Sequence, residues 1–305
     1  MKVNRFMVLE EFYKRNLLNA ESDLEKEYLR LKSGFEGEKE LASWLKRRLG
    51  AESTVLHNLE IKKFNRTQVD LMVLWDNLWW VIEVKNYGGL FKISDKENVL
   101  GDWRMPVDQL ASMRNRLRIM EELARSVDSQ IQVEGSFVMI HPDAEVIMQD
   151  EEKFDVLTRN QINRAISRRM TEYHSYSPWK IKRYLHALSQ HIDPYPEKIP
   201  VLTQKMWEDC EKGVRCPKCD HYLLASSNKM LACGSCGYKG FKASFVLDLF
   251  KQLLVLLHDR KERVNAQILV EFSGNLIGRK AICRGLSQHA QIVKKGPASY
   301  FKLRE

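Results

Sequence analysis

Three reactive side chains stand out in the otherwise apolar stretch VDLMVLWDNLWWVIEVKN, residues 69–86: Asp70, Glu83 and Lys85. Two carboxylates opposed in a sheet repel each other, and near an apolar core a proton or a cation must lie between them. Mg²⁺ takes oxygen ligands, often one or two carboxylates with substrate phosphate. A lysine beside such an ion can orient or, in its neutral form, deprotonate the attacking water, or as a cation stabilise developing phosphate charge. The pattern predicts a divalent-metal site, with a surface Glu–Lys ion pair as the alternative.

These side chains meet only if the stretch folds as a hairpin. Asp76-Asn77 fits a two-residue turn, which places Asp70 opposite Glu83 and Gln68 opposite Lys85. Side chains alternate between the faces of a strand, so one face of this hairpin is apolar throughout. The other face is apolar near the turn and charged at its far end. We expect a hairpin inside a sheet covered on both sides, with a polar pocket at one end.

Further elements are needed to support the hairpin. The apolar periodicity predicts a charged helical segment over residues 1–33, an interruption at Ser33-Gly34, and a second helix ending at Gly50. Pro106 is expected to begin another helix, which reaches about Arg125. Strands are predicted at 53–61, 68–75, 78–85, 136–140 and 154–157, and basic helices at 160–171 and 178–191.

The spacing D-x12-E-x-K resembles the core of the PD-(D/E)XK nucleases. Four blocks over about residues 34–145 are similar to the nuclease-related domain, NERD: GFEGEKELASWL, NRTQVDLMVLW, VIEVKNYGG and MPVDQLASMRNRL. The resemblance implies an α/β, restriction-endonuclease-like core in which a central mixed sheet is flanked by helices. It also implies a metal-dependent nuclease.

The resemblance implies roles for five residues. Glu38 corresponds to the acidic residue of the first helix, and Gln109 to the polar residue of the helix after Pro106. Asp70 and Glu83 correspond to the ligands of Mg²⁺ or Mn²⁺, and Lys85 corresponds to the catalytic lysine.

Some positions have simpler interpretations. Glu38 also fits a favourable acid in a first helical turn, and Gln109 fits a solvent-facing helix residue. Leu71 stands where family members often carry histidine, and we expect its side chain on the apolar face of the hairpin. His57 and His141 have no companion ligands at useful spacing and are expected to be structural.

A C-x2-C-x13-C-x2-C array is formed by Cys216, Cys219, Cys233 and Cys236. Two C-x2-C turns can supply the four thiolates of a tetrahedral Zn²⁺ site, and a closed four-sulfur site is structural rather than catalytic. The array predicts a zinc ribbon holding one structural Zn²⁺. A redox dithiol and two disulfides are the alternatives.

The C-terminal pattern predicts three helices followed by two short strands, an order that resembles a winged helix. Arg279, Lys280 and Arg284 are expected on the groove-facing helix, and Lys294 and Lys295 at the tip of the hairpin. These five residues are the predicted nucleic-acid contacts. A solvated basic face and a protein-interaction module are the alternatives.

The composition favours an acidic partner. The 305 residues include 49 basic against 40 acidic side chains, which gives a net charge of +9, and nucleic acid is the commonest acidic partner. No run is long and apolar enough for a membrane span, and the first residues lack a secretory signal, so a cytoplasmic protein is expected. The paired cysteines agree, because in such a compartment they indicate a metal site.

The predicted organisation has five parts, namely an N-terminal helical segment, the nuclease-like domain with a helical extension, a linker, the zinc ribbon and the winged-helix-like domain. Their bounds are 1–33, 34–192, 193–209, 210–241 and 242–305. The expected activity is hydrolysis of phosphodiester bonds, with DNA as the expected substrate. The alternatives are a non-catalytic DNA-binding or regulatory protein that keeps the core, and a scaffold that binds a protein partner through the C-terminal module.

Overall fold

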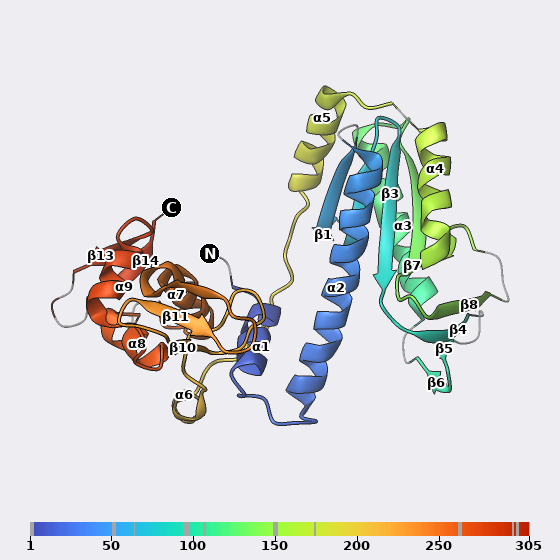
Figure 1. Cartoon of the computed structure of the whole chain (residues 1–305). Coiled ribbons are helices and arrows are strands. Elements are labelled where there is room, and N and C mark those ends of the chain that lie inside the picture. The colour runs from blue at the N-terminus through green and yellow to red at the C-terminus, as the bar shows by residue number, and fades with distance from the viewer. Residues whose placement is uncertain are drawn as a thin grey trace. The chain divides into compact units, whose positions relative to one another are not determined.

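The computed structural model contains two compact units, residues 30–196 and residues 1–29 with 197–305 (Figure 1). It describes residues 3–50, 53–63, 65–93, 98–105, 108–148, 152–173, 175–261, 264–294, 296 and 299–304. The N-terminal residues therefore group with the C-terminal part of the chain, and the unit between them is continuous. We call the continuous unit the core unit and the other the split unit.

A five-stranded mixed sheet forms the centre of the core unit, in the strand order β1-β2-β3-β7-β9. Its strands are β1 (Thr54–Lys62), β2 (Arg66–Leu74), β3 (Leu78–Lys85), β7 (Gln132–Met139) and β9 (Asp155–Thr158). The pairs β1–β2 and β2–β3 are antiparallel, whereas β3–β7 and β7–β9 are parallel pairs. The predicted α/β fold with a central mixed sheet is confirmed.

Helices cover both faces of this sheet (Figure 1). Apolar residues of α2 (Asp23–Leu49) and α4 (Ile162–Glu172) pack on the face that carries Leu71 and Ile82. Apolar residues of α3 (Gln109–Val127) and α5 (Pro178–Ser189) pack on the face that carries Met72 and Val81. Both sides of the β2–β3 hairpin are therefore buried, as the sequence predicts.

The β2–β3 hairpin has the predicted register. Leu71 pairs with Ile82, Leu74 pairs with Trp79, and the N–H of Trp75 donates to the carbonyl of Leu78 at 2.9 Å.

The buried Asp76 fixes the turn of this hairpin. Its carboxylate accepts hydrogen bonds from the hydroxyls of Ser175 and Ser177 and from the Ser177 N–H, at 2.6–2.7 Å. Its carbonyl accepts a hydrogen bond from the hydroxyl of Tyr184 on α5. The turn residue thus ties the hairpin to α5, which helps to fix the position of everything at the other end of the two strands.

A second, smaller sheet continues from the end of β3, in the strand order β6-β5-β4-β8. Its strands are β4 (Gly89–Ile93), β5 (Asn98–Leu100), β6 (Trp103–Arg104) and β8 (Ala144–Met148). Phe91 and Ile93 of β4 join the core beneath α3. The predicted helix after Pro106 is α3, although Pro106 itself lies outside the described residues.

The predicted interruption at Ser33-Gly34 is wrong, because α2 continues through both residues. Glycine costs about 1 kcal/mol in a helix relative to alanine, a penalty that tertiary contacts of the same helix can offset. Residues of α2 one helical turn after Ser33-Gly34 make such contacts. Gly37 lies so close to the end of β3 that an added Cβ would meet Asn86 Cβ and Ile140 Cγ2 at 2.9 Å. The Asn86 amide also donates to the carbonyl of Ser33 at 2.9 Å.

The split unit has one apolar core shared by its N-terminal and C-terminal parts. Its helices are α1 (Arg5–Lys14), α6 (Gln204–Asp209), α7 (Val246–Leu256), α8 (Ala266–Phe272) and α9 (Arg279–Leu286). Its strands are β10 (Leu223–Ala225), β11 (Met230–Cys233), β12 (Lys239–Phe241), β13 (Ala290–Val293) and β14 (Tyr300–Leu303). None of the helices in the described part of the chain is long and apolar enough to cross a bilayer.

Charged groups tie α1 to the rest of the split unit. Arg215 donates to the carboxylate of Glu11 at 2.9 Å, and both side chains are buried. The guanidinium of Arg15 donates to the carbonyl of Glu211 and to the side chain of Gln252, each at 2.8 Å.

The helix α6 lies at the end of the range predicted as a linker. The order of three helices and an antiparallel β13–β14 pair is as predicted, and the winged-helix assignment stays a prediction.

The close approach of α2 to β3 predicts opposite effects for two glycines of one helix. Gly37→Ala is expected to lower the free energy of unfolding of the core unit by about 1–3 kcal/mol, because the new methyl group is overpacked. Gly34→Ala is the matched control. Its Cβ meets nothing within 4 Å, so it is expected to raise stability by about 0.5–1 kcal/mol. Urea unfolding followed by tryptophan fluorescence measures both, and equal effects at the two positions would contradict the prediction.

Candidate functional site

The predicted carboxylates meet where the ladder between β2 and β3 ends. The described backbone pairing stops at Leu71 and Ile82. Beyond it, the Asp70 carboxyl accepts a hydrogen bond from the N–H of Val84 at 2.8 Å and is hydrogen-bonded to Glu83. Asp70 and Glu83 are only 7% and 6% exposed. The structure therefore brings together the two side chains that the sequence predicts as metal ligands.

Two cations neutralise Glu83. Lys85 Nζ lies 2.7 Å from one carboxylate oxygen, and Arg116 Nη1 of α3 lies 2.7 Å from the other. Arg116 also donates through Nε to the backbone carbonyl of Gln68. One guanidinium thus links β2 to β3 beyond their last backbone pair. Sequence reasoning missed Arg116, although it lies within the block that resembles the nuclease-related domain.

Burial and mutual repulsion set the protonation of the two carboxyls. Burial, followed by the charges of Glu83 and Glu38, raises the pKa of Asp70 to about 8. Burial also acts to raise the pKa of Glu83, but Lys85 and Arg116 outweigh it and hold that pKa below its ordinary value. At neutral pH Asp70 is therefore a neutral acid that can donate to the Glu83 carboxylate. The raised pKa of Asp70 thus favours a proton between the two carboxyls, one of the two solutions that the sequence argument allows.

Lys85 remains a cation in this environment. Burial acts to lower its pKa, but the charge of Glu83 and its hydrogen bond outweigh burial, so the pKa lies above its ordinary value. A protonated Lys85 can stabilise negative charge on a phosphate, whereas it cannot accept a proton from water. Of the roles that the sequence leaves open for Lys85, the geometry therefore favours stabilisation of negative charge on the phosphate over deprotonation of water.

Glu38 lies on α2 directly after Gly37, the point of closest approach to β3. Burial, with the charge of Glu83, raises the pKa of Glu38 to about 7. Its Oε2 lies 3.4 Å from Nε2 of His57 on β1. Burial lowers the pKa of His57, so this ring is neutral at neutral pH. The structure thus gives His57 an acidic neighbour that the sequence spacing does not reveal.

Other residues of the matching blocks have supporting places. Gln68 donates from its side chain to Asn58 at 2.9 Å, and the predicted pairing of Gln68 with Lys85 lies beyond the described ladder. Gln109 begins α3 and is half-buried; its side chain makes no hydrogen bond to any residue that the structure describes. Leu71 is fully buried on the face opposite the carboxyls, as expected.

The four predicted cysteines converge within the split unit. Their sulfur atoms all lie within 4.8 Å of one another, with Cys216–Cys236 at 3.6 Å and Cys219–Cys233 at 3.4 Å. All four thiols are free. Four sulfurs at about 2.3 Å from one tetrahedral ion would be separated by similar distances. The cluster has the geometry for a Zn²⁺ site, and its four cysteines form no disulfide.

Two matching turns build this cluster. In each, the second cysteine is followed by a residue with positive φ: Asp220 at 64° and Gly237 at 71°. The N–H groups of Asp220 and Gly237 donate to the carbonyls of Cys216 and Cys233. The strands β10, β11 and β12 form a three-stranded antiparallel sheet around the turns. We call residues 214–242 the cysteine module.

The predicted nucleic-acid contacts lie on two elements. Arg279, Lys280 and Arg284 are exposed on α9, and Lys294 is exposed directly after β13. Lys295 lies outside the described residues.

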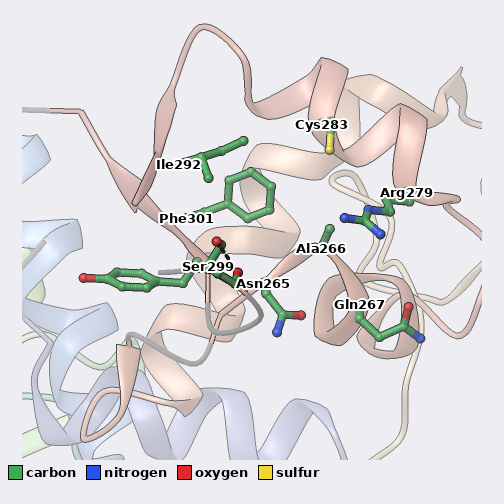
Figure 2. A pocket seen from close by; sticks show the side chains of 10 residues that line it. Asn265, Ala266, Gln267, Arg279, Cys283, Ile292, Ser299 and Phe301 are labelled. Atoms are coloured by element: carbon green, nitrogen blue, oxygen red, sulfur yellow. Dashed lines mark hydrogen bonds between the residues drawn. The ribbon is translucent and has the colours of Figure 1, made fainter. Parts of the chain in front are cut away.

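A pocket of about 330 Å³ lies between α8, α9 and the β13–β14 hairpin. Figure 2 shows Arg279 and Cys283 at this pocket, together with Ile292 and Phe301 of the hairpin.

Comparison with known proteins finds one family similar to part of the core unit. Residues 33–140 match the family model of the nuclease-related domain, NERD. The match includes Glu38, Asp70, Glu83, Lys85 and Gln109, and it confirms the predicted resemblance over this stretch. A nuclease-related domain supports a nuclease-like function and implies a nucleic-acid substrate.

The chain also resembles a solved structure of a type III CRISPR defence DNA nuclease activated by cyclic oligoadenylate. The two are 15% identical with a TM-score of 0.25, and the alignment covers 55% of this chain and 27% of that chain. No curated protein matches the chain.

The raised pKa of Asp70 predicts a pH-dependent stability. The folded protein holds a proton that the unfolded chain has released between about pH 4 and about pH 8, so the free energy of unfolding falls as pH rises through that range. Glu38 acts in the same direction. Without added divalent cations, the core unit is expected to be less stable at about pH 8.5 than at about pH 6, and less of this difference is expected in Asp70→Asn.

Denaturation followed by tryptophan fluorescence measures this effect, since six of the seven tryptophans lie in the core unit. The exposed Asp102→Asn serves as the control and should keep the wild-type pH dependence. An identical pH dependence in Asp70→Asn and the wild type would contradict the prediction.

The sulfur geometry predicts about one zinc ion per chain. Cys219→Ser is expected to lower the zinc content and to unfold the cysteine module, because one ligand of a closed site is lost. Cys283→Ser, at an exposed thiol on α9, is expected to leave the zinc content unchanged. Elemental analysis of purified protein measures the ion. Zinc-free wild-type protein with a folded module would be the opposite result.

Proposed function

We propose that the protein is a metal-dependent nuclease that hydrolyses phosphodiester bonds, with DNA as its expected substrate. The observation that supports this most directly is the junction of Asp70, Glu83 and Lys85 at the end of the β2–β3 ladder. These residues lie within the stretch that matches the nuclease-related domain.

The donor set fits a divalent cation, because two buried carboxyls that otherwise share a proton can instead share an ion. Asp70 and Glu83 would hold Mg²⁺ or Mn²⁺, which when bound would activate water and neutralise the scissile phosphate. The ammonium of Lys85 would stabilise charge on the phosphate. Glu38 would support the same site from α2, and Gln109 would act from the start of α3.

The split unit would hold the nucleic acid. A structural Zn²⁺ on Cys216, Cys219, Cys233 and Cys236 would stabilise the cysteine module as a zinc ribbon. The exposed cations Arg279, Lys280 and Arg284 would contact phosphates from α9, as the recognition helix of a winged helix does, with Lys294 and Lys295 on the adjoining hairpin. The expected location of such a protein is the cytoplasm.

One observation favours a second candidate function. Both oxygens of Glu83 already face cations of the chain, Lys85 and Arg116. A cluster neutralised in this way is also compatible with a non-catalytic DNA-binding or regulatory protein that keeps the nuclease-like core. In that case the protein binds nucleic acid in a salt-sensitive manner and does not cleave it. If no nucleic acid binds at low salt, a protein-binding scaffold remains as the third candidate.

Cleavage assays with matched variants test the proposal. Wild-type protein with Mg²⁺ or Mn²⁺ is expected to cleave DNA, compared across single-stranded, duplex and RNA substrates. Asp70→Asn and Lys85→Met are expected to lower the rate by at least about 10²-fold, because the first removes a ligand of the metal ion and the second removes the cation at the reacting phosphate. Asp102→Asn and Lys182→Met remove exposed charges elsewhere in the core unit and should cleave normally.

Folding of each variant is checked by circular dichroism. Cleavage that persists in folded Asp70→Asn would refute the catalytic proposal. Binding without cleavage in the wild type would favour the second candidate.

A further inference from the structure

One face of the small sheet in the cysteine module is apolar and exposed. Directly opposed residues of antiparallel strands share a face, as do residues two apart along one strand. Leu224 pairs with Ala232, which pairs with Lys239, and Met230 pairs with Phe241. These five residues therefore share one face. Leu231 and Leu223, which alternate with them, are buried on the other face.

The largest apolar groups on this face are open to solvent. Phe241 is 63% exposed and Leu224 is 66% exposed, whereas Met230 beside Phe241 is half-buried. At this exposure the ring of Phe241 is accessible to a partner. A core or turn role does not explain this exposure, because the sheet already buries its opposite side.

Three lysines lie on this face or at its edge. Lys239 shares the face with Phe241. Lys229 and Lys242 lie opposite each other at the strand ends, next in sequence to Met230 and Phe241, and the N–H of Lys242 donates to the carbonyl of Lys229. Within the part of the chain that the structure describes, none of these three ammonium groups has an ion-pair partner. An anionic partner would relieve their mutual repulsion.

We propose that this face is a stacking platform for single-stranded nucleic acid, with a base on the Phe241 ring and phosphates at Lys229, Lys239 and Lys242. The inference rests on the proposed nucleic-acid function. It specifies that the nucleic acid is single-stranded and that it binds to the face that carries Phe241. Single-strand binding surfaces combine aromatic rings, on which bases stack, with cations that follow the backbone. Stacking accepts any base, so the platform binds without regard to sequence.

The size of the face argues against a protein partner. Strands lie about 4.8 Å apart and rise about 3.3 Å per residue, so three strands of three or four residues cover a patch roughly 15 Å on a side. A stable protein interface needs about 800 Å² per partner. A nucleobase with its neighbouring phosphates fits the smaller area, and the uncompensated lysines match its charge.

Fluorescence anisotropy of the full, zinc-loaded chain tests the platform without divalent cations, so that no strand is cut. The probe is a labelled oligothymidylate of about twelve nucleotides. Phe241→Leu keeps an apolar group but removes the ring, and it is expected to weaken binding about tenfold. Phe241→Trp is expected to keep wild-type affinity or exceed it. Lys239→Gln is expected to reduce the salt dependence of binding.

Matched controls separate this inference from the proposed function. Trp179→Leu removes an equally exposed ring (64%) from the core unit and is expected to bind as the wild type does. A labelled oligouridylate tells RNA from DNA, and duplex DNA is expected to bind Phe241→Leu normally.

Unchanged oligothymidylate binding in folded Phe241→Leu would refute the stacking platform and would favour a protein as the partner of this face. Absence of binding in the wild type would overturn it as well. In either case the cleavage assay with Asp70→Asn judges the nuclease proposal independently.

Discussion

The arrangement of the core unit depends on three carboxyl groups crowded together where β2 and β3 stop pairing. Asp70, Glu83 and Glu38 are buried or half-buried, and the charge of Glu83 raises the pKa of both Asp70 and Glu38. Such a cluster is costly in an apolar layer unless protons or cations compensate it. The chain supplies Lys85 and Arg116 to Glu83 and leaves a proton on Asp70. A group of this kind lowers stability, and carboxyls with strongly shifted pKa values are concentrated at functional sites.

The surrounding fold is arranged to hold this crowded end in place. At the opposite end, Asp76 ties the turn to α5 through three hydrogen bonds to its carboxylate. At the crowded end, Gly37 allows α2 to reach β3, and Arg116 joins the diverging strands from α3. Helices on opposite faces of the sheet thus place Glu38 and Arg116 within the electrostatic surroundings of Glu83. The ladder can end there without the strands separating, because a guanidinium replaces the next backbone pair.

Sequence patterns predicted the hairpin because neighbouring residues alone determine its turn and its register. A two-residue turn fixes the register, and alternation then fixes which side chains share a face. Arg116 and the contact between Glu38 and His57 were not predictable in this way, because each depends on how a helix is rotated and seated on the sheet. The continuity of α2 through Ser33-Gly34 depends likewise on packing one turn later. The C-x2-C pairs predicted the cysteine cluster correctly, because four cysteines at this spacing are typical of a metal site.

The cationic side chains of the protein differ in whether the fold pairs them with carboxylates. Several arginines of the core unit are engaged in ion pairs, such as Arg169 with Glu134 and Asp155, so their charge is used within the fold. The lysines beside Phe241 have no such partners among the described residues. Lysine is a strongly hydrated point charge that loses entropy when held in one geometry, so an unpaired cluster is not there for stability. Charge left unpaired beside an exposed ring is best explained by a ligand that brings both phosphate and a flat base.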